Sequence, residues 1–200
     1  VSYVPCTILA GGVPVRIPTT AKQQFVPDPD QIATAITPRT KAILLGYPNN
    51  PTGAVASRET LEAIAKIAVE RDLVVISDEI YDRLVYGIEH TCVASLPGMR
   101  DRTVLLGGFS KAYAMTGWRI GYAAARPDIV EAMMKVHQYT VMCAPTQAQV
   151  AAIEALRHGE AEVQRMRGEY DTRRRAIVDG FNELGLDCFE PRGAFYAFPC

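Results

Sequence analysis

Three short, uninterrupted apolar runs constrain the fold of this chain more than any other feature of its sequence. They cover residues 42–45, 73–76 and 104–106, and a polar cluster follows each of them at once. Continuous runs of this length, as opposed to alternating ones, are typical of strands in a parallel sheet covered by helices. We therefore expect an α/β fold with a mostly parallel sheet, helices on both faces, and strands that are buried on both faces.

The segment between the first two runs has the pattern of a crossover helix. Ser57 is placed as its N-cap, and apolar residues recur at helical spacing up to Arg71. Too few residues separate the third run from the next apolar segment, 118–125, for a comfortable helical crossover, so we expect an antiparallel strand there. The apolar positions of the predicted helix are Leu61, Ile64, Ala65 and Ala68.

Beyond residue 126 the pattern is mainly helical. Helices are expected at 127–137 and 145–156, each with a proline near its first turn, and at 160–184, where Gly185 ends the helix. The run Arg173-Arg174-Arg175 has acidic neighbours and indicates a solvated, charge-balanced face. Residues 193–198 are expected to form a short aromatic strand.

Composition narrows the class of ligand. The net charge of -1, from 21 basic and 22 acidic residues, gives no electrostatic reason to expect nucleic acid or a membrane as partner, so a small molecule fits better. The five cysteines are an odd number and widely scattered, which favours reduced thiols in the cytoplasm. The three histidines have no partners at metal-ligand spacing, so we expect no metal site.

The polar clusters after the three runs would meet at one edge of the sheet, where open α/β folds bind their ligands. Taken singly, Asn-Pro-Thr-Gly is a turn, an aspartate after a strand is a helix N-cap, and a lysine is a surface residue. Their conjunction at successive strand ends favours a binding site. The sequence has neither a GxxxxGK[ST] loop nor GxGxxG, so ATP and dinucleotides lose their main support. The clusters supply an amide from Asn49-Asn50, a carboxylate and a phenol from residues 77–81, and the amine of Lys111.

Four segments carry a resemblance to a known family. They read Asn-Asn-Pro-Thr-Gly at 49–53, Ser-Asp-Glu-Ile-Tyr at 77–81, Phe-Ser-Lys at 109–111 and Met-Thr-Gly-Trp-Arg-Ile-Gly-Tyr at 115–122. In this order they resemble the class I/II aminotransferases that depend on pyridoxal 5'-phosphate (PLP), the aspartate-aminotransferase-like enzymes of fold type I. The resemblance runs from about residue 13 to residue 196.

The resemblance implies an enzyme that moves an amino group between an L-amino acid and a 2-oxo acid. Lys111 would form the Schiff base with PLP and, once released, would move the proton at the substrate Cα. Asp78 would pair with the pyridine nitrogen and keep it protonated, so that the ring accepts electrons. Asn50 and Tyr81 would hydrogen-bond the 3′-oxygen of the ring.

The resemblance assigns the cofactor phosphate to two further residues. Ser110 would donate its hydroxyl, and Arg119 would act as a two-pronged charged donor. The family often has a second serine three positions before the lysine, where this chain has Gly108. We expect one phosphate hydroxyl fewer, with a backbone N–H in its place.

The resemblance also divides the chain. Residues 1–158 would be the second part of the large PLP-binding domain, and residues 159–200 the interdomain helix and the beginning of a small α+β C-terminal domain. The phosphate-binding turn and the ring-stacking aromatic are expected before Val1, and the arginine for the substrate α-carboxylate after Cys200. A homodimer is expected, and the 200 residues alone are expected to be inactive.

Two alternatives stay open from the sequence. One is another PLP reaction on the same scaffold, such as that of a C–S lyase or an aminocyclopropane-carboxylate synthase. The motifs are more similar to the transaminating branch. The other is an aminotransferase-like sensor domain of a transcription regulator, which a basic winged-helix segment upstream would indicate. Which amino donor is used depends on residues outside this sequence.

Overall fold

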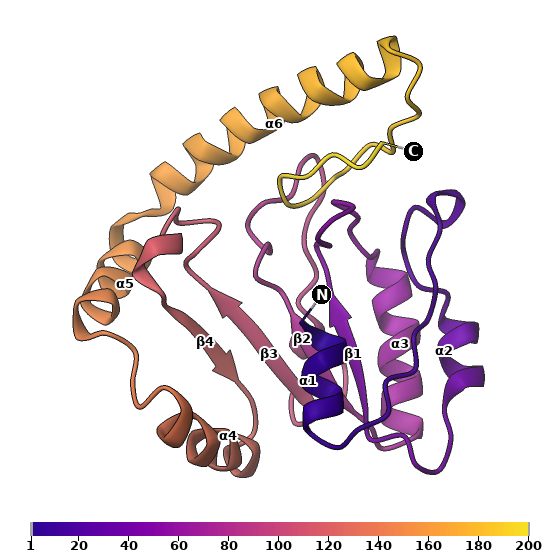
Figure 1. Cartoon of the computed structure of the whole chain (residues 1–200), viewed down its shortest axis with the longest axis vertical. Helices are drawn as coiled ribbons and strands as arrows, with labels where there is room; N and C mark the ends of the chain where they lie inside the picture. Colours follow the sequence, from indigo (N-terminus) through magenta and orange to yellow (C-terminus); the bar gives the residue numbers. More distant parts are fainter. Residues whose placement is uncertain (1, 200) are drawn as a thin grey trace.

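A four-stranded sheet organises residues 2–199, the part of the chain that the computed structural model describes (Figure 1). Its order is β1-β2-β3-β4, with the first three strands parallel and β4 antiparallel to β3. The parallel strands and the antiparallel fourth strand predicted from the sequence are therefore confirmed. The strands are β1 (Ala42–Gly46), β2 (Val74–Asp78), β3 (Thr103–Gly108) and β4 (Gly121–Ala124).

The longer helices follow the predicted segments, and Gly185 with its φ of 77° comes just after the last of them. Two short helices, α1 (Tyr3–Leu9) and α2 (Pro29–Ala35), were not predicted, because seven residues give too little periodicity to detect. The longer helices are α3 (Arg58–Glu70), α4 (Pro127–Thr140), α5 (Thr146–His158) and α6 (Glu160–Glu183). Single turns of 3-10 helix are η1 (Ala21–Gln23), η2 (Val93–Ser95) and η3 (Thr116–Trp118).

Helix α3 is fixed by its N-cap and by its buried face. Ser57 Oγ accepts a hydrogen bond of 3.2 Å from the Thr60 N–H, as the sequence predicts for an N-cap. The four predicted inner positions are all buried and belong to one core cluster with Leu45 of β1 and Val75 of β2. Truncating Ile64, which is 1% exposed, to alanine would cost about 3 kcal/mol.

The two faces of the sheet are covered unequally within residues 2–199. Leu45 points toward α3, and because neighbours in a strand alternate, Gly46 faces the other side, where Tyr3 of α1 lies against it. Leu44, on that same side, is 37% exposed, and all of β4 is exposed. Helices therefore lie on both sides of the sheet, but the expectation that the strands are buried on both faces is wrong for these positions. On that side, Tyr3 of α1 contacts the sheet at Gly46 of β1 and at Asp78 of β2.

Residues 193–198 do not form the predicted strand. The Gly193 N–H donates to the Gly53 carbonyl and the Ala194 N–H to the Leu84 carbonyl, both at 2.8 Å, and the chain turns at Ala194, whose φ is 56°. The backbone groups thus bond to two separate loops, which leaves no continuous ladder. Figure 1 shows this yellow segment passing over the upper end of the sheet, below α6.

The arginine run on α6 is charge-balanced as predicted, but one of its members is not solvated. The Arg174 side chain is 11% exposed, pairs with Asp171 at 2.8 Å, and stacks on Tyr86 with its guanidinium carbon 5.3 Å from the ring centroid. It also donates to the Pro191 carbonyl at 3.2 Å. Arg174 therefore anchors the C-terminal segment to α6, and the prediction of a solvated face is wrong for it.

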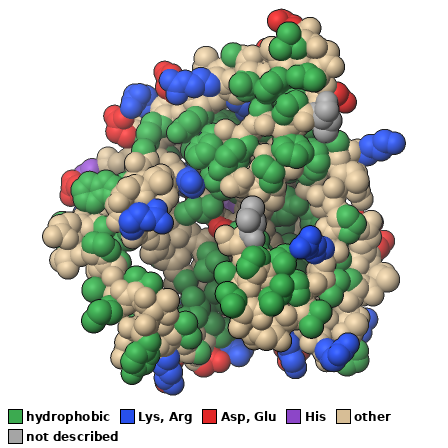
Figure 2. Space-filling view, viewed as in Figure 1, with side chains coloured by type: hydrophobic (Ala, Val, Ile, Leu, Met, Phe, Trp, Pro, Cys, Tyr) green, Lys and Arg blue, Asp and Glu red, His purple; other side chains and the backbone are tan. Residues whose placement is uncertain are grey.

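The surface of the described residues is mixed. Figure 2 shows apolar side chains spread over much of one face, with many of the charged ones near its outline. Large apolar side chains are exposed on α4 and α5, including Met134, Tyr139 and Leu156. Within residues 2–199 no helix combines the length and the apolar character needed to cross a bilayer.

Candidate active site

The three parallel strands end at a common edge of the sheet. Gly46 of β1 stands opposite Asp78 of β2, and Asp78 stands opposite Leu106 of β3. Because the strands run in one direction, the segments that follow them leave from the same edge. These segments carry Asn50, Tyr81 and Lys111, as the sequence predicted.

Tyr81 is the residue around which the predicted groups gather. It is 4% exposed, and the Lys111 Nζ lies 5.7 Å from the centroid of its ring. The side chain of Asn50 and the charge of Asp78 both act on its phenol. The ring of Phe195, which the sequence analysis left outside the site, lies 5.6 Å from the same Nζ. The structure thus brings together an amine, a carboxylate, an amide and a phenol.

The phenol of Tyr81 is held in its protonated form. Burial is the main cause that raises its pKa above the ordinary value, while the Asn50 side chain acts in the opposite direction. A protonated phenol has one hydrogen to donate and an oxygen that accepts. Tyr81 can therefore donate to an anionic ligand at neutral pH.

Both oxygens of the Asp78 carboxylate are held within the chain. Oδ1 accepts a hydrogen bond of 3.2 Å from the Ile80 N–H, and Oδ2 accepts one from the hydroxyl of Tyr3. Burial and this bond to the carboxylate both raise the pKa of Tyr3, so its phenol stays a donor. Each carboxylate oxygen can accept a second bond, so Asp78 keeps capacity for a ligand N–H.

Ser110 and Arg119 are linked through the loop between β3 and β4. Arg119 Nη1 donates to the Thr116 carbonyl, and Thr116 Oγ1 donates to the Ser110 carbonyl, both at 2.7 Å. Arg119 is exposed and takes a left-handed backbone with φ of 54°. This loop ties the guanidinium group to the peptide that leads into Lys111. The site therefore has two parts, one around Tyr81 and one around Thr116.

The structure gives a reason for the glycine at position 108. A Cβ there would lie 2.9 Å from Ile80 Cδ1 and 3.1 Å from Gly121 Cα in the paired strand, closer than ordinary contacts. A serine would require Ile80 or β4 to move. Glycine at this position therefore fits the close packing between β3, β4 and the loop after β2.

The two neighbouring asparagines of the loop after β1 have different surroundings. Asn49 accepts from Thr52 Oγ1 at 2.9 Å and donates to the Gly46 carbonyl at 3.1 Å, so its side chain shapes the turn. Asn50 is exposed and lies toward Tyr81. The peptide bonds Tyr47-Pro48 and Asn50-Pro51 are both cis. Of the two amides, only that of Asn50 is therefore turned toward the site.

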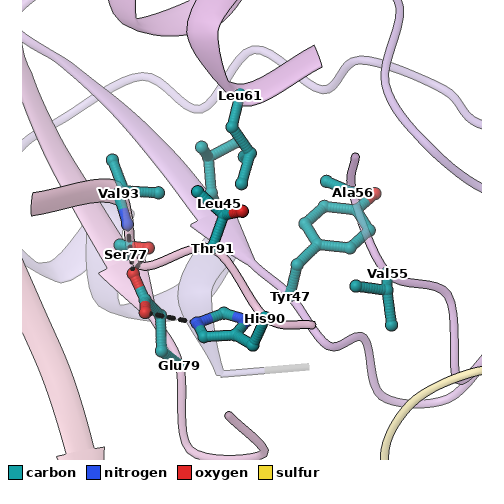
Figure 3. A pocket seen from close by; sticks show the side chains of 10 residues that line it. All are labelled: Leu45, Tyr47, Val55, Ala56, Leu61, Ser77, Glu79, His90, Thr91 and Val93. Carbon is teal, nitrogen blue, oxygen red and sulfur yellow. Dashed lines mark hydrogen bonds and ion pairs between the residues drawn. The ribbon is translucent and has the colours of Figure 1, made fainter. Parts of the chain in front are cut away.

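A buried polar cluster lies beside Asp78 and was not predicted (Figure 3). Glu79 is 4% exposed and accepts from Ser77 Oγ at 2.8 Å and from the Val93 N–H at 3.0 Å, and its second oxygen is 2.6 Å from His90 Nε2. The adjoining cavity of about 10 Å³ is at the lower limit for a single water, so it has no room for a substrate. The cluster therefore fixes the backbone from which the Asp78 side chain projects.

The charge of Glu79 is stabilised where it is buried. Burial alone would raise the pKa of this carboxyl, but the hydrogen bonds from His90, Val93 and Ser77 outweigh it, and the pKa lies below its ordinary value. His90 is one of the three histidines for which no metal site was expected, and its partner in the structure is the Glu79 carboxylate. Across residues 2–199 no three His, Cys, Asp or Glu side chains gather as a metal-binding group would require.

Tyr3, Glu79, Phe195 and Tyr196 are the residues that sequence reasoning missed. Phe195 and Tyr196 lie in the segment that was predicted as a short aromatic strand, and that prediction gave no reason to place them at the site. Glu79 is part of Ser-Asp-Glu-Ile-Tyr, but the resemblance implied roles only for Asp78 and Tyr81 of that segment. Tyr3 carries no signal, because nothing in its sequence surroundings shows which strand it faces.

Comparison with known proteins gives a consistent result over the whole chain. The sequence profile of the family "Aminotransferase class I and II" matches residues 1–199. The chain is 46% identical over 202 residues both to the aromatic-amino-acid aminotransferase 2 of Thermococcus litoralis and to the aspartate aminotransferase of Pyrococcus abyssi. These alignments cover 100% of this chain and 52% of each relative.

A solved structure agrees with the sequence relatives. The fold superposes on the aromatic aminotransferase of Pyrococcus horikoshii with a TM-score of 0.96 and 46% identity, covering 100% of this chain and 54% of that one. The chain thus spans about half the length of the relatives that it matches.

Proposed function

The chain belongs to the class I and II aminotransferases, and on that premise we propose that it holds the cofactor site of an enzyme that transfers an amino group between an L-amino acid and a 2-oxo acid. The observation that carries this proposal is the arrangement of Lys111, Asp78 and Asn50 about the phenol of Tyr81. This arrangement places one amine and one carboxylate at the ends of neighbouring strands. The relatives are named aminotransferases, which favours transamination over the lyase alternative.

The residues present fit PLP by the chemistry of their donors. Lys111 is a primary amine, Asp78 is a carboxylate whose oxygens keep unused acceptor capacity, and Tyr81 is a protonated phenol. Arg119 offers a guanidinium group on an exposed loop, with Ser110 tied to the same loop. An aldehyde, a pyridine nitrogen, a phenolic oxygen and a phosphate are the groups that these side chains would hold.

When bound, PLP supplies an electron sink for the bonds at the substrate Cα. Each residue then has a task of its own. The Lys111 amine would hold the cofactor covalently and, once released, would carry the proton at Cα. Asp78 would keep a proton on the ring nitrogen. Tyr81 and Asn50 would hold the 3′-oxygen, while Ser110 and Arg119 would hold the phosphate.

The remaining features of the enzyme are proposals of the same kind. The substrates named for the relatives differ, so we propose an L-amino acid and a 2-oxo acid without a narrower choice. A homodimer and a cytoplasmic location are proposed from the family resemblance and from the odd, scattered cysteines. A domain boundary at residues 158–159 is supported by the start of α6 at Glu160.

Covalent trapping tests the proposed function. The complete protein is loaded with PLP, reduced with borohydride and digested, and the label is expected on Lys111. The variant Lys111→Ala is the matched control and should carry no label at that peptide. Label on Lys22, Lys41, Lys66 or Lys135 in place of Lys111 would show that the assignment is wrong. Glutamate formation from 2-oxoglutarate and a set of amino acids then tests transamination itself.

A further inference from the structure

We propose that Tyr196 is a positioning residue that sets the direction of the hydrogen bond made by Tyr81. In this arrangement the Tyr196 hydroxyl donates to the Tyr81 oxygen, so that the Tyr81 proton is directed to the cofactor. The inference rests on the proposed function, because it assigns Tyr81 to the 3′-oxygen of PLP.

The two phenols meet directly, although 115 positions separate them in the chain. Their oxygens are 2.6 Å apart, and the rings pack edge to face with centroids 5.8 Å apart. The same apolar cluster contains Leu84 and Ala194, and both are completely buried. The short bond and the packing of this cluster thus hold the two phenols against each other.

The number of hydrogens decides the direction of this bond. Each phenol has one hydrogen, and geometry allows either oxygen to be the donor. If Tyr81 gave its hydrogen to Tyr196, none would remain for the cofactor. An anionic 3′-oxygen is a stronger acceptor than a neutral phenol, so it takes the Tyr81 hydrogen and leaves Tyr196 as the donor. Consecutive donors polarise one another, which makes Tyr81 the stronger donor.

Backbone contacts keep Tyr196 in place. Ala194 donates to the Leu84 carbonyl at 2.8 Å, and its own carbonyl accepts from the Tyr86 hydroxyl at 2.5 Å. Gly53 approaches so closely that a Cβ there would lie 3.2 Å from the Tyr196 carbonyl oxygen. The segment that carries Tyr196 is therefore docked on the loops after β1 and β2, which also carry the predicted cofactor ligands.

The effect of this bond can be measured at the nitrogen that joins Lys111 to the cofactor. When the linkage nitrogen is deprotonated, no neighbouring N–H balances the negative charge of the 3′-oxygen. A hydrogen-bond donor to this oxygen therefore stabilises the deprotonated form. A strong Tyr81 donor therefore lowers the pKa of the linkage nitrogen. Loss of the Tyr196 hydroxyl weakens Tyr81 and should raise this pKa by about 0.5 unit, against about 1 unit for loss of the Tyr81 hydroxyl.

The test is a spectroscopic pH titration of the complete, PLP-loaded protein. Tyr196→Phe and Tyr81→Phe are compared with Tyr170→Phe, the matched control. Tyr170 belongs to the same apolar cluster and packs on Phe195 at 5.4 Å, so its variant removes a phenol and leaves the Tyr81–Tyr196 bond intact. The expected result is an upward shift for Tyr196→Phe, a larger one for Tyr81→Phe, and none for Tyr170→Phe.

A second substitution guards against misfolding of the phenylalanine variant. Placing 3-fluorotyrosine at position 196 changes the shape little and makes the phenol more acidic, hence a stronger donor. The linkage pKa should then fall, a sign opposite to that of Tyr196→Phe. A purely structural role for Tyr196 would not reverse sign in this way.

The outcomes separate this inference from the proposed function. If wild-type protein forms the Lys111 linkage but Tyr196→Phe and the fluorinated protein titrate like the Tyr170→Phe control, the role of Tyr196 is overturned and the cofactor assignment stands. A further shift from Tyr196→Phe in a Tyr81→Phe background would also overturn it, because the effect would not pass through Tyr81. Failure of wild-type protein to form any Lys111 linkage would overturn both.

Discussion

The phenol of Tyr3 donates a hydrogen bond to the carboxylate of Asp78, although the two residues lie 75 positions apart in the chain. Gly46, the partner of Asp78 across the sheet, makes room for it, because a Cβ there would lie 3.3 Å from the Tyr3 hydroxyl oxygen. With the Ile80 N–H on the other oxygen, the carboxylate is oriented from both sides. Asp78, the residue proposed to keep the ring nitrogen of the cofactor protonated, is thus oriented by α1 as well as by β2.

Changing Tyr3 to Phe should reduce turnover of the complete enzyme about tenfold, which is the usual scale for one hydrogen bond to a charged group. The reason is loss of orientation at Asp78, with the carboxylate itself retained. Steady-state kinetics measure the effect. In an Asp78→Ala background the same change should have no further effect. Additive losses in the double variant would show that Tyr3 acts elsewhere.

Replacing Asp78 with alanine should leave PLP bound and slow transamination by roughly a hundredfold or more. Without the carboxylate the ring nitrogen is neutral and the ring is a weak electron sink. Absorbance reports cofactor binding, and glutamate formation reports the rate. The exposed Asp101→Ala is the matched control and should behave like wild type. Near-normal turnover in Asp78→Ala would refute the role.

Glu79 should make stability depend on pH in the acid range. Its pKa is lowered in the folded state, so its contribution is fully present above the unfolded pKa of about 4.3 and is lost as the pH falls through the lower folded value. Glu79→Gln should lower the free energy of unfolding by about 2 kcal/mol at pH 7 and should flatten its decline below pH 4.3.

Urea unfolding between pH 3 and pH 7 checks the Glu79 prediction. Glu131→Gln is the control, because the Glu131 side chain is 71% exposed and its pair with Lys135 lies on the surface. It should change stability by less than about 0.5 kcal/mol. An unaltered acid slope in Glu79→Gln would contradict the assignment.

Gly53 should tolerate no side chain, because an added Cβ would clash with the C-terminal segment. Gly87 serves as the control for backbone strain alone. Both have positive φ, 70° and 67°, so alanine at either position strains the backbone by about 1 kcal/mol. At Gly53 the added Cβ would also lie 2.3 Å from Pro191 Cβ, whereas at Gly87 it meets nothing within 4 Å. Gly53→Ala should therefore cost at least about 2 kcal/mol more than Gly87→Ala in thermal or chemical unfolding. Equal losses would show that the C-terminal segment is not docked on this loop.

Local pattern was sufficient for most of the architecture. The continuous runs predicted β1, β2 and β3, since a strand buried in a parallel sheet needs apolar residues on both sides. The spacing of Leu61 and Ile64, with Ser57 as N-cap, predicted α3 because capping and helical periodicity act within a few residues. The same reasoning failed for residues 193–198, whose backbone partners are loops far away in the sequence.

For the site, the sequence by itself determined the kinds of group that reach the sheet edge, because the residue after a strand in a parallel sheet has little choice of position. The resemblance of the motifs then suggested the roles proposed for Lys111, Asp78 and Asn50. Tertiary structure alone decided that Tyr196 meets Tyr81, that Tyr3 orients Asp78, and that Arg174 is buried against Tyr86. The first two contacts join residues 75 and 115 positions apart in the chain, and no local pattern encodes a contact over such a separation. The third depends on which face of α6 packs inward.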